Sequence, residues 1–148
     1  MGGMDDLLRV VRAFHEISMV TSTRLEPALS RLRLTYQTGQ ALWAIDPDLP
    51  PPPMRAMALR LHCNASNLTF IAKQLEDRGY VERRRDPHDG RSSVLALTVE
   101  GERVRGEVIE AALEGTPFAA LAPADLSVLV ATLAKVAEVA DLDLVQDL

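Results

Sequence analysis

The chain has 148 residues, of which 47% are apolar and 25% charged, and its formal net charge is −5. This length and composition predict one globular domain with one hydrophobic core. No apolar run approaches the ~18 residues of a membrane span, the acidic start MGGMDD does not resemble a secretory signal, and the single cysteine cannot form an intramolecular disulfide. We therefore expect a cytoplasmic protein without a membrane partner.

The charge is distributed unevenly along the sequence. Residues 1–53 carry a net charge of −1, residues 54–98 a net charge of +3, and residues 99–148 a net charge of −7. A polyanion responds to the local field rather than to the total charge, so the middle third is the part expected to bind one. The acidic last third is expected to face away from it.

The first part of the chain has the pattern of a long helix. Apolar residues recur at helical spacing from residue 4 to about residue 25. Pro27 is expected to end or kink this helix, although residues 28–32 could continue it by a further turn. Thr35 then caps a second, shorter helix, and the four prolines at residues 50–53 form a stiff, extended connector.

Two short helical patterns joined by a tight turn follow the prolines, and their spacing is that of a helix-turn-helix. The first covers residues 54–61, and the second is capped by Asn64 and ends before Gly79. His62 occupies a turn position that requires positive φ, which histidine tolerates better than most residues. The core positions of the second helix are predicted to be Leu68, Ile71, Ala72 and Leu75.

A β-hairpin is predicted directly after the second helix of this motif. Its strands cover residues 80–85 and 92–98, and its turn contains an Asp-Gly pair. It carries four arginines, namely Arg83, Arg84, Arg85 and Arg91. Because a hairpin needs no such charge to fold, the hairpin and the helix-turn-helix together predict a winged helix that binds double-stranded DNA. The alternative is a solvated basic hairpin on an unrelated domain.

The last third of the chain is predicted to be helical. Thr98 caps a helix that reaches about residue 114, Pro117 interrupts the chain, and a final helix starts near Pro123. The final helix has apolar residues at positions 126, 129, 130, 133, 136, 137, 140 and 144. This face is wider than one small domain needs, so a second subunit is expected to cover it. The predicted fold class is mainly α with a small β-hairpin wing (α+β).

The outward face of the second helix of the motif carries small and polar side chains. Those expected to contact DNA are Ser66, Asn67, Thr69, Phe70 and Lys73. Asn67 can pair with adenine through two hydrogen bonds, which are worth about 1–3 kcal/mol of discrimination. Ser66 and Thr69 can bind phosphates or touch a thymine methyl group, and Lys73 is expected over a phosphate. Phe70 either packs on thymine methyl groups or folds under the wing.

The arginines of the hairpin cannot all face DNA, because side chains alternate across a strand. Of Arg83, Arg84 and Arg85, one or two are expected at the DNA backbone and another in a pair with a nearby carboxylate. Arg91 follows the turn and can enter a minor groove, where narrow A·T-rich DNA attracts arginine. Asp89 is expected to hold the Arg91 guanidinium in a fixed pose.

Three motifs in and around the hairpin carry a family resemblance. They are QLEDRGYVERR at residues 74–84, DPHDGRS at residues 86–92 and LTVEG at residues 97–101. Through them the chain resembles the MarR (multiple antibiotic resistance regulator) family of bacterial transcription factors, most strongly over residues 54–105. The Asp-Pro-x-Asp-x-Arg wing is the specific part of the match, whereas the flanking helices match only in pattern.

The resemblance implies a homodimeric repressor that places two winged helices on a pseudo-palindromic operator. It divides the chain by role into an N-terminal dimerisation helix at 1–34, a DNA-binding winged helix-turn-helix at 35–98 and C-terminal dimerisation helices at 99–148, all within one compact domain. It also implies that Arg91 reads the minor groove with Asp89 as its partner. The sequence departs from the family pattern at His62, Pro53 and Ala122, where a turn glycine, a polar cap and a capping serine are usual.

Members of this family often release DNA when a small aromatic or phenolic molecule binds between the dimerisation helices and the winged helix. In this sequence the side chains available for such a cavity are His15, Met19, Tyr36 and Trp43. The alternative for Trp43 is a place in the core. Some relatives sense oxidants through a cysteine near the N-terminus, but Cys63 lies in the turn of the motif, so we interpret it as a structural thiol.

No pattern typical of an enzyme accompanies these features. The three histidines fall in separate predicted elements, no group of residues has metal-ligand spacing, and no glycine-rich phosphate loop occurs. The chain is therefore predicted to be no enzyme and to need no cofactor or metal. The alternative function is a winged-helix module that binds a protein partner without sequence-specific DNA binding.

Overall fold

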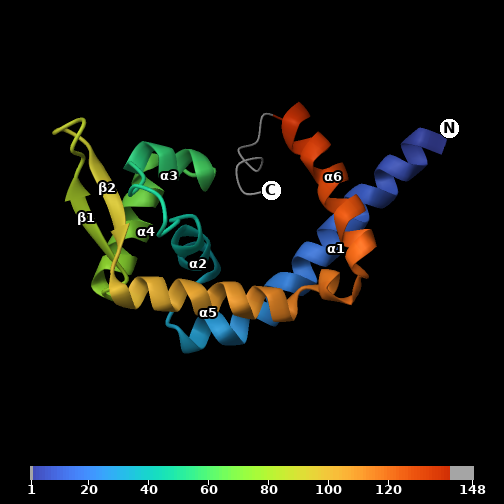
Figure 1. Cartoon of the computed structure of the whole chain (residues 1–148), viewed down its shortest axis with the longest axis horizontal. Coiled ribbons are helices and arrows are strands. Elements are labelled where there is room, and N and C mark those ends of the chain that lie inside the picture. Colours follow the sequence, from blue (N-terminus) through green and yellow to red (C-terminus); the bar gives the residue numbers. More distant parts are fainter. Residues whose placement is uncertain (1, 141–148) are drawn as a thin grey trace. The chain divides into compact units, whose positions relative to one another are not determined.

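The computed structural model describes residues 2–140, and the chain divides into two compact units with the boundary between Thr116 and Pro117. The first unit contains α1 (Gly2–Arg31), α2 (Tyr36–Trp43), α3 (Met54–Arg60), α4 (Ala65–Asp77), β1 (Val81–Arg85), β2 (Ser93–Leu97) and α5 (Val99–Gly115) (Figure 1). The second contains a 3₁₀ helix, Pro117–Ala120, and α6 (Pro123–Val139). The predicted class, mainly α with a β-hairpin wing, is confirmed. The predicted C-terminal positions from residue 141 onward lie outside the described residues.

The first helix does not end at Pro27. α1 continues to Arg31 with Pro27 inside it, so the alternative that residues after Pro27 extend the helix by a further turn is the correct one. Proline removes one N–H donor, but Leu25, Ala28 and Leu29 around it are buried, and this packing outweighs the local preference. The helix instead ends where Arg33 takes a positive φ of 60°.

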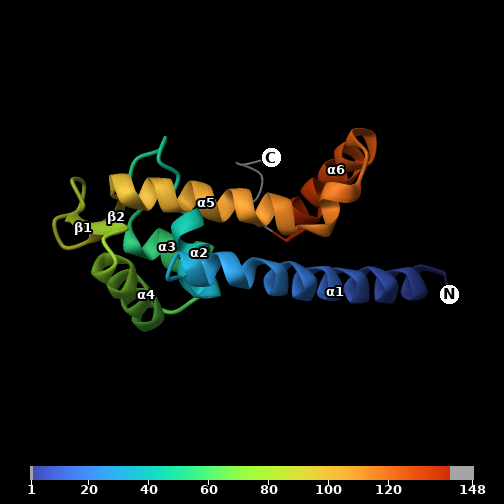
Figure 2. The same ribbon diagram turned by 90° about the horizontal axis from the view of Figure 1, so that it is seen from below.

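The C-terminal part of α1 lies beside α5 (Figure 2), and polar contacts tie this end of the chain to α5 and to the residues that follow α4. Arg24 Nη1 donates to the Gly115 carbonyl at 3.2 Å. Beyond the helix, the Tyr80 hydroxyl donates to the Leu32 carbonyl at 2.9 Å, and Arg78 Nε donates to the carbonyl of Arg33. These bonds satisfy the backbone at the end of α1 and fix that end against the winged helix.

The caps of the middle helices follow the sequence expectations. Thr35 caps α2 and forms a reciprocal capping box with Thr38, whose hydroxyl accepts from the Thr35 N–H at 2.8 Å. Pro53 before α3 and Ala122 before α6 supply no side-chain cap, as their departure from the family pattern predicts. His62, in the turn between α3 and α4, has a φ of 50°, so histidine does take the left-handed position.

The core of the first unit is formed around α4. All four predicted core residues of this helix, Leu68, Ile71, Ala72 and Leu75, are exposed by 3% or less. They pack with buried side chains of the neighbouring elements, among them Leu42, Met57, Leu95, Val104 and Val108. The helix-turn-helix is therefore held by its own core within one protomer.

The wing is a two-stranded antiparallel sheet with β1 and β2 in register from Val81 opposite Leu97 to Arg85 opposite Ser93. The proline segment at 50–53 lies along the other edge of β2. Pro53 pairs with Val94 in an isolated bridge, and the Pro52 carbonyl accepts from the Leu95 N–H at 3.0 Å. The segment predicted as a plain connector therefore also holds the base of the wing.

Gly101 lets the start of α5 approach the end of α4. The Thr98 hydroxyl donates to the Gly79 carbonyl at 2.6 Å and accepts from the Gly101 N–H at 3.0 Å. A Cβ at position 101 would lie 1.8 Å from the Tyr80 carbonyl oxygen, which no side chain can tolerate. The glycine is thus required by this packing, despite its low helix propensity.

The second unit exposes much of its apolar surface. Ala137 is the only buried residue of α6 in the described part of the chain. Val128, Val136 and Val139 are 67%, 56% and 90% exposed. The helix therefore presents the unburied apolar surface that its sequence predicts.

Candidate nucleic-acid interface

The exposed face of α4 begins at a well-capped N-terminus. Asn64 Oδ1 accepts from the Asn67 N–H at 2.8 Å, which fixes the first turn of the helix. Because Leu68, Ile71, Ala72 and Leu75 all point into the core, the predicted DNA-contacting residues Ser66, Asn67, Thr69, Phe70 and Lys73 are left exposed. The structure thus brings these five side chains together on one face of one helix.

Two residues of this face present apolar groups to solvent. The Thr69 hydroxyl donates to the Ala65 carbonyl at 2.9 Å, so its hydrogen is already used within the helix. Phe70 is 64% exposed, so the alternative that it folds under the wing is wrong. Lys73 forms an exposed i,i+4 pair with Asp77 at 3.3 Å, which is weak enough to yield to a phosphate.

The arginines of β1 divide into paired and unpaired groups. Arg83 forms an ion pair with Glu76 of α4 at 3.2 Å, and Arg84 pairs with Glu82 at 2.9 Å. Among residues 2–140, neither Arg85 nor Arg91 forms a salt bridge. The prediction that one arginine of the strand pairs with a nearby carboxylate is confirmed, and the second pair, to α4, was not foreseen.

The turn of the wing is closed by Asp89. Its Oδ1 accepts from the Arg91 N–H and its Oδ2 from the Ser92 hydroxyl, both at 3.0 Å. These two bonds, the backbone one first, lower the pKa of Asp89, and the nearby charge of Arg55 on α3 adds to the effect. The predicted pairing of Asp89 with the Arg91 guanidinium is absent from the described residues, since the carboxylate holds the backbone of Arg91 and leaves its side chain available.

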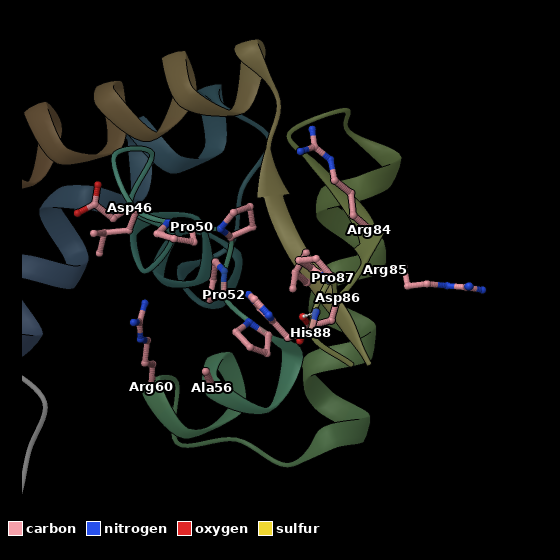
Figure 3. A pocket seen from close by; sticks show the side chains of 14 residues that line it. Asp46, Pro50, Pro52, Ala56, Arg60, Arg84, Arg85, Asp86, Pro87 and His88 are labelled. Atoms are coloured by element: carbon pink, nitrogen blue, oxygen red, sulfur yellow. Dashed lines mark hydrogen bonds between the residues drawn. The ribbon is translucent and has the colours of Figure 1, made fainter. Parts of the chain in front are cut away.

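The four residues predicted to line an effector cavity lie elsewhere on the first unit. His15, Met19, Tyr36 and Trp43 are all exposed, and none of them lines the pocket beside the proline segment (Figure 3) or the pocket between α1 and α5. Trp43 is 42% exposed, so its alternative place in the core is wrong. Cys63 is half-buried and packs against the core.

Two residues near this surface were not predicted from the sequence to influence the site. Arg55 lies close enough to the wing to influence Asp89, and Glu76 orients Arg83 from α4. The motif spacing places Arg55 at the start of α3, but only the packing of α3 beside the wing shows its proximity to the turn. In the same residues 2–140 no helix has the length and apolar character for a membrane crossing, and no three His, Cys, Asp or Glu side chains gather around a metal position.

The helix-turn-helix, the arginine-bearing wing and the exposed face of α4 define a DNA-binding regulator of the winged-helix class. Residues 34–93 match the MarR family model, the family that the motifs around the hairpin resemble. Members of that family are regulators of transcription rather than enzymes. No curated protein sequence matches the chain significantly.

Solved structures of transcriptional regulators, one of them described as a MarR family member, share the fold. AbsC, a MarR family transcriptional regulator from Streptomyces coelicolor, is 23% identical with a TM-score of 0.71, and the match covers 88% of this chain and 91% of AbsC. CouR from Rhodococcus jostii RHA1, bound to p-coumaroyl-CoA, is 22% identical with a TM-score of 0.72, covering 86% of this chain and 91% of CouR. The transcriptional repressor CouR bound to a 23-mer DNA duplex is 22% identical with a TM-score of 0.70. This match covers 84% of this chain and 89% of CouR.

Proposed function

We propose that the protein is a homodimeric repressor that binds a pseudo-palindromic operator through α4 and the wing. The observation that carries this proposal is the pairing of the exposed face of α4 with a wing whose Arg85 and Arg91 side chains are available to an anion. Phosphate contacts by these arginines would position the protein, and the first turns of α4 would read base edges in the major groove. The similar structure of the transcriptional repressor CouR is bound to a 23-mer DNA duplex, which supports DNA binding by this fold.

Dimerisation is supported by the first half of α1. Met4, Leu7, Leu8, Val11 and Phe14 recur at helical spacing on one face and are 46–73% exposed. An apolar stripe of this kind on a soluble protein marks an interaction surface. A two-fold dimer would present two winged helices to half-sites whose centres lie about one helical turn apart, roughly 34–36 Å.

The composition of the α4 face predicts the sequence preference. Asn67 is suited to adenine, because its amide oxygen can accept a hydrogen bond from adenine N6–H while its amide NH2 donates one to N7, in one bidentate pair. Thr69, whose hydroxyl hydrogen is used within the helix, presents its methyl group, and Phe70 presents its ring. Both are complementary to the 5-methyl group of thymine, so we expect half-sites that place adenine next to thymines.

The test is a gel shift and footprint on the DNA upstream of the gene that encodes the protein. We expect one protected, roughly palindromic site whose log affinity falls with log salt by about 0.9 for each phosphate contacted. Replacing the thymines of the half-site by uracil removes only the methyl groups, and should weaken binding by the parent protein more than binding by Phe70→Ala, which retains only the Thr69 contact. Failure to bind any duplex in dilute buffer would contradict the proposal and favour the protein-binding module.

We also propose that a small aromatic or phenolic effector releases the protein from DNA. CouR in its complex with p-coumaroyl-CoA provides the precedent among the similar structures. His15, Met19, Tyr36 and Trp43 are exposed in the protomer, as residues that line a cavity completed by a second subunit would be. Phenolic compounds added to the same gel shift should release the DNA. We place the protein in the cytoplasm, where a bacterial regulator meets the chromosome.

A further inference from the structure

The end of α4 is joined to the end of α1 by side-chain hydrogen bonds. Arg78, the residue after α4, donates from Nε to the Arg33 carbonyl. Tyr80 donates from its hydroxyl to the Leu32 carbonyl at 2.9 Å. A further bond, from Arg78 Nη1 to the Gln74 carbonyl at 2.8 Å, attaches the same guanidinium to the last turn of α4. We call Arg78 and Tyr80, with the carbonyls they bind, the α1–α4 clamp.

The clamp joins backbone that is held on both sides. The Leu34 N–H donates to the Leu29 carbonyl at 2.8 Å and closes the end of α1. The start of α5 meets the residues after α4 (Figure 1), where the Thr98 N–H donates to the Tyr80 carbonyl at 3.1 Å. The Thr98 hydroxyl donates to the Gly79 carbonyl at 2.6 Å, and Tyr80 is only 7% exposed. The clamp therefore connects two well-held helix ends rather than two loose loops.

Apolar packing and the clamp contribute differently to this joint. Leu25 and Leu29 of α1 lie in the same core as the buried side chains of α4, and this burial holds the helices together. Burial is non-directional, whereas a hydrogen bond weakens steeply away from its preferred angle. The planar guanidinium of Arg78 bonds to both helix ends in a fixed geometry. The clamp therefore fixes the angle between α1 and α4 more closely than packing alone.

A small change of this angle has a large effect at the other end of α4. The helix has 13 residues, so its first turn, which carries Ser66 and Asn67, lies roughly 18 Å from the clamp. A rotation of about 10° at the clamp displaces that turn by about 3 Å, which is close to the ~3.4 Å rise of one base pair. In a dimer the same rotation acts on both copies of α4, so it changes the distance between them.

We propose that Arg78 and Tyr80 are positioning residues that set the spacing of the two operator half-sites. The apolar stripe of α1 and the clamp lie at opposite ends of that helix, so the clamp is the link through which the dimer interface orients α4. Arg78 and Tyr80 act through α4 and not by reading DNA bases. The proposal rests on the proposed homodimer, and it adds the residues that make this dimer selective for one spacing.

The first test measures the separation of the two α4 helices without DNA. A spin label at Ala65→Cys, in a Cys63→Ala background, reports from the first turn of α4, and double electron–electron resonance gives the distance between the labels of the two protomers. Arg78→Met keeps the aliphatic stem of the side chain and Tyr80→Phe keeps the ring, so the double variant removes only the donors. We expect its distance distribution to be broader than that of the labelled parent by about 3 Å or more. Equal widths in two folded dimers overturn the proposal.

The second test compares gel-shift affinities for the operator and for the same operator with one base pair inserted between the half-sites. Binding to the longer site strains the two bonds that reach α1, and each bond is worth roughly fivefold in an equilibrium constant. The double variant should therefore lose about tenfold of the parent's preference for the original spacing, and should keep its affinity for a single half-site. Tyr80→Phe alone should lose a smaller part of the preference. An unchanged preference in the folded double variant overturns the proposal.

Arg24→Met is the matched control. Arg24 Nη1 also joins α1 to a carbonyl, that of Gly115 at 3.2 Å, but this carbonyl belongs to α5 and not to the end of α4. The control should keep the label distances and the spacing preference of the parent. If it relaxes both as far as the double variant does, the assignment to Arg78 and Tyr80 is wrong. If the labels behave as expected and the parent ignores every duplex, only the proposed function is overturned, whereas a strictly monomeric parent overturns both.

Discussion

The winged helix buries its apolar side chains, whereas the first half of α1 exposes them. In the winged helix Leu75 and Leu95 are completely buried, whereas Met4 and Leu8 of α1 are 73% and 57% exposed. The first region completes its core within one protomer, and the second presents an apolar surface that only another surface can cover. Folding of the winged helix and the proposed dimerisation thus depend on different residues, and substitutions can test the two separately.

The largest expected effect is a loss of stability at Gly101, where α5 packs against the winged helix. Gly101→Ala places a methyl group 1.8 Å from the Tyr80 carbonyl oxygen, so α5 must move away from the end of α4. We expect the free energy of unfolding to fall by about 3 kcal/mol or more, measured by chemical denaturation at fixed protein concentration.

Gly106→Ala is the matched control in the same helix. A Cβ at position 106 meets nothing within 4 Å, so the substitution should stabilise the protein by about 0.5–1 kcal/mol through helix propensity alone. Equal effects of the two substitutions would show that the contact with Tyr80 is not what requires Gly101.

The next largest expected effect is a loss of dimerisation through the apolar stripe of α1. Val11 is 57% exposed in the middle of the apolar stripe of α1, so Val11→Glu costs the protomer little. In the proposed dimer it buries a charge without a partner, which should weaken association by at least about 3 kcal/mol, or roughly 100-fold. Analytical ultracentrifugation measures this change, and circular dichroism should show a folded winged helix.

Arg9→Gln is the control for this assembly test. Arg9 lies on the opposite face of α1 and is highly exposed in a pair with Asp6. Its substitution should leave the dimer intact. A dimer that survives Val11→Glu would remove the stripe from the interface.

A smaller effect sharpens the comparison because it changes neither the core of the winged helix nor the apolar stripe of α1. Arg91→Ala should weaken operator binding about tenfold and reduce the salt slope by about one, with unfolding and dimerisation unchanged. Arg84→Ala, at an arginine already paired with Glu82, should cost less. Gel shifts across a salt series measure both, and equal affinity of Arg91→Ala and the parent would refute the role of the wing arginine.

The smallest effect concerns Asp89 and pH. Bonds from the Arg91 N–H and then the Ser92 hydroxyl hold the pKa of this carboxyl below its ordinary value of 3.8. Because the folded-state pKa is lowered, the stabilisation of the turn is fully present above that ordinary value and is lost as pH falls through the lowered pKa. The Arg91 amide resonance should therefore titrate with a midpoint below 3.8, and Asp89→Asn should abolish this transition. A midpoint at 3.8 or higher would contradict the bonding described here.

Local signals explain why much of the winged helix was predictable. The Asn64 cap, the left-handed His62 and the buried stripe of α4 depend on residues within a few positions of one another. The exposed face of the candidate site follows from that stripe by elimination, since a residue that does not face the core of a helix faces outward.

Contacts between distant residues explain what was not predicted. Packing around Pro27 decides between the two alternatives predicted for α1, and Gly101 is required by the carbonyl of Tyr80, more than 20 residues away in sequence. The partner chosen by Asp89 depends on the conformation of the turn, in which the backbone N–H of Arg91 is nearer than its guanidinium. The pocket at the proline segment needs the tertiary arrangement of three elements and has no local signature.

The prolines at the base of the wing also bear on aggregation. A small sheet with an open edge is a template for strands of other chains. Here the edge of β2 is occupied by residues that accept a hydrogen bond but cannot extend the ladder, because proline has no N–H to donate. The opposite edge, β1, carries four consecutive charged side chains from Glu82 to Arg85. The hairpin can therefore project into solvent, in a monomer or a dimer, without recruiting further copies into a growing β-structure.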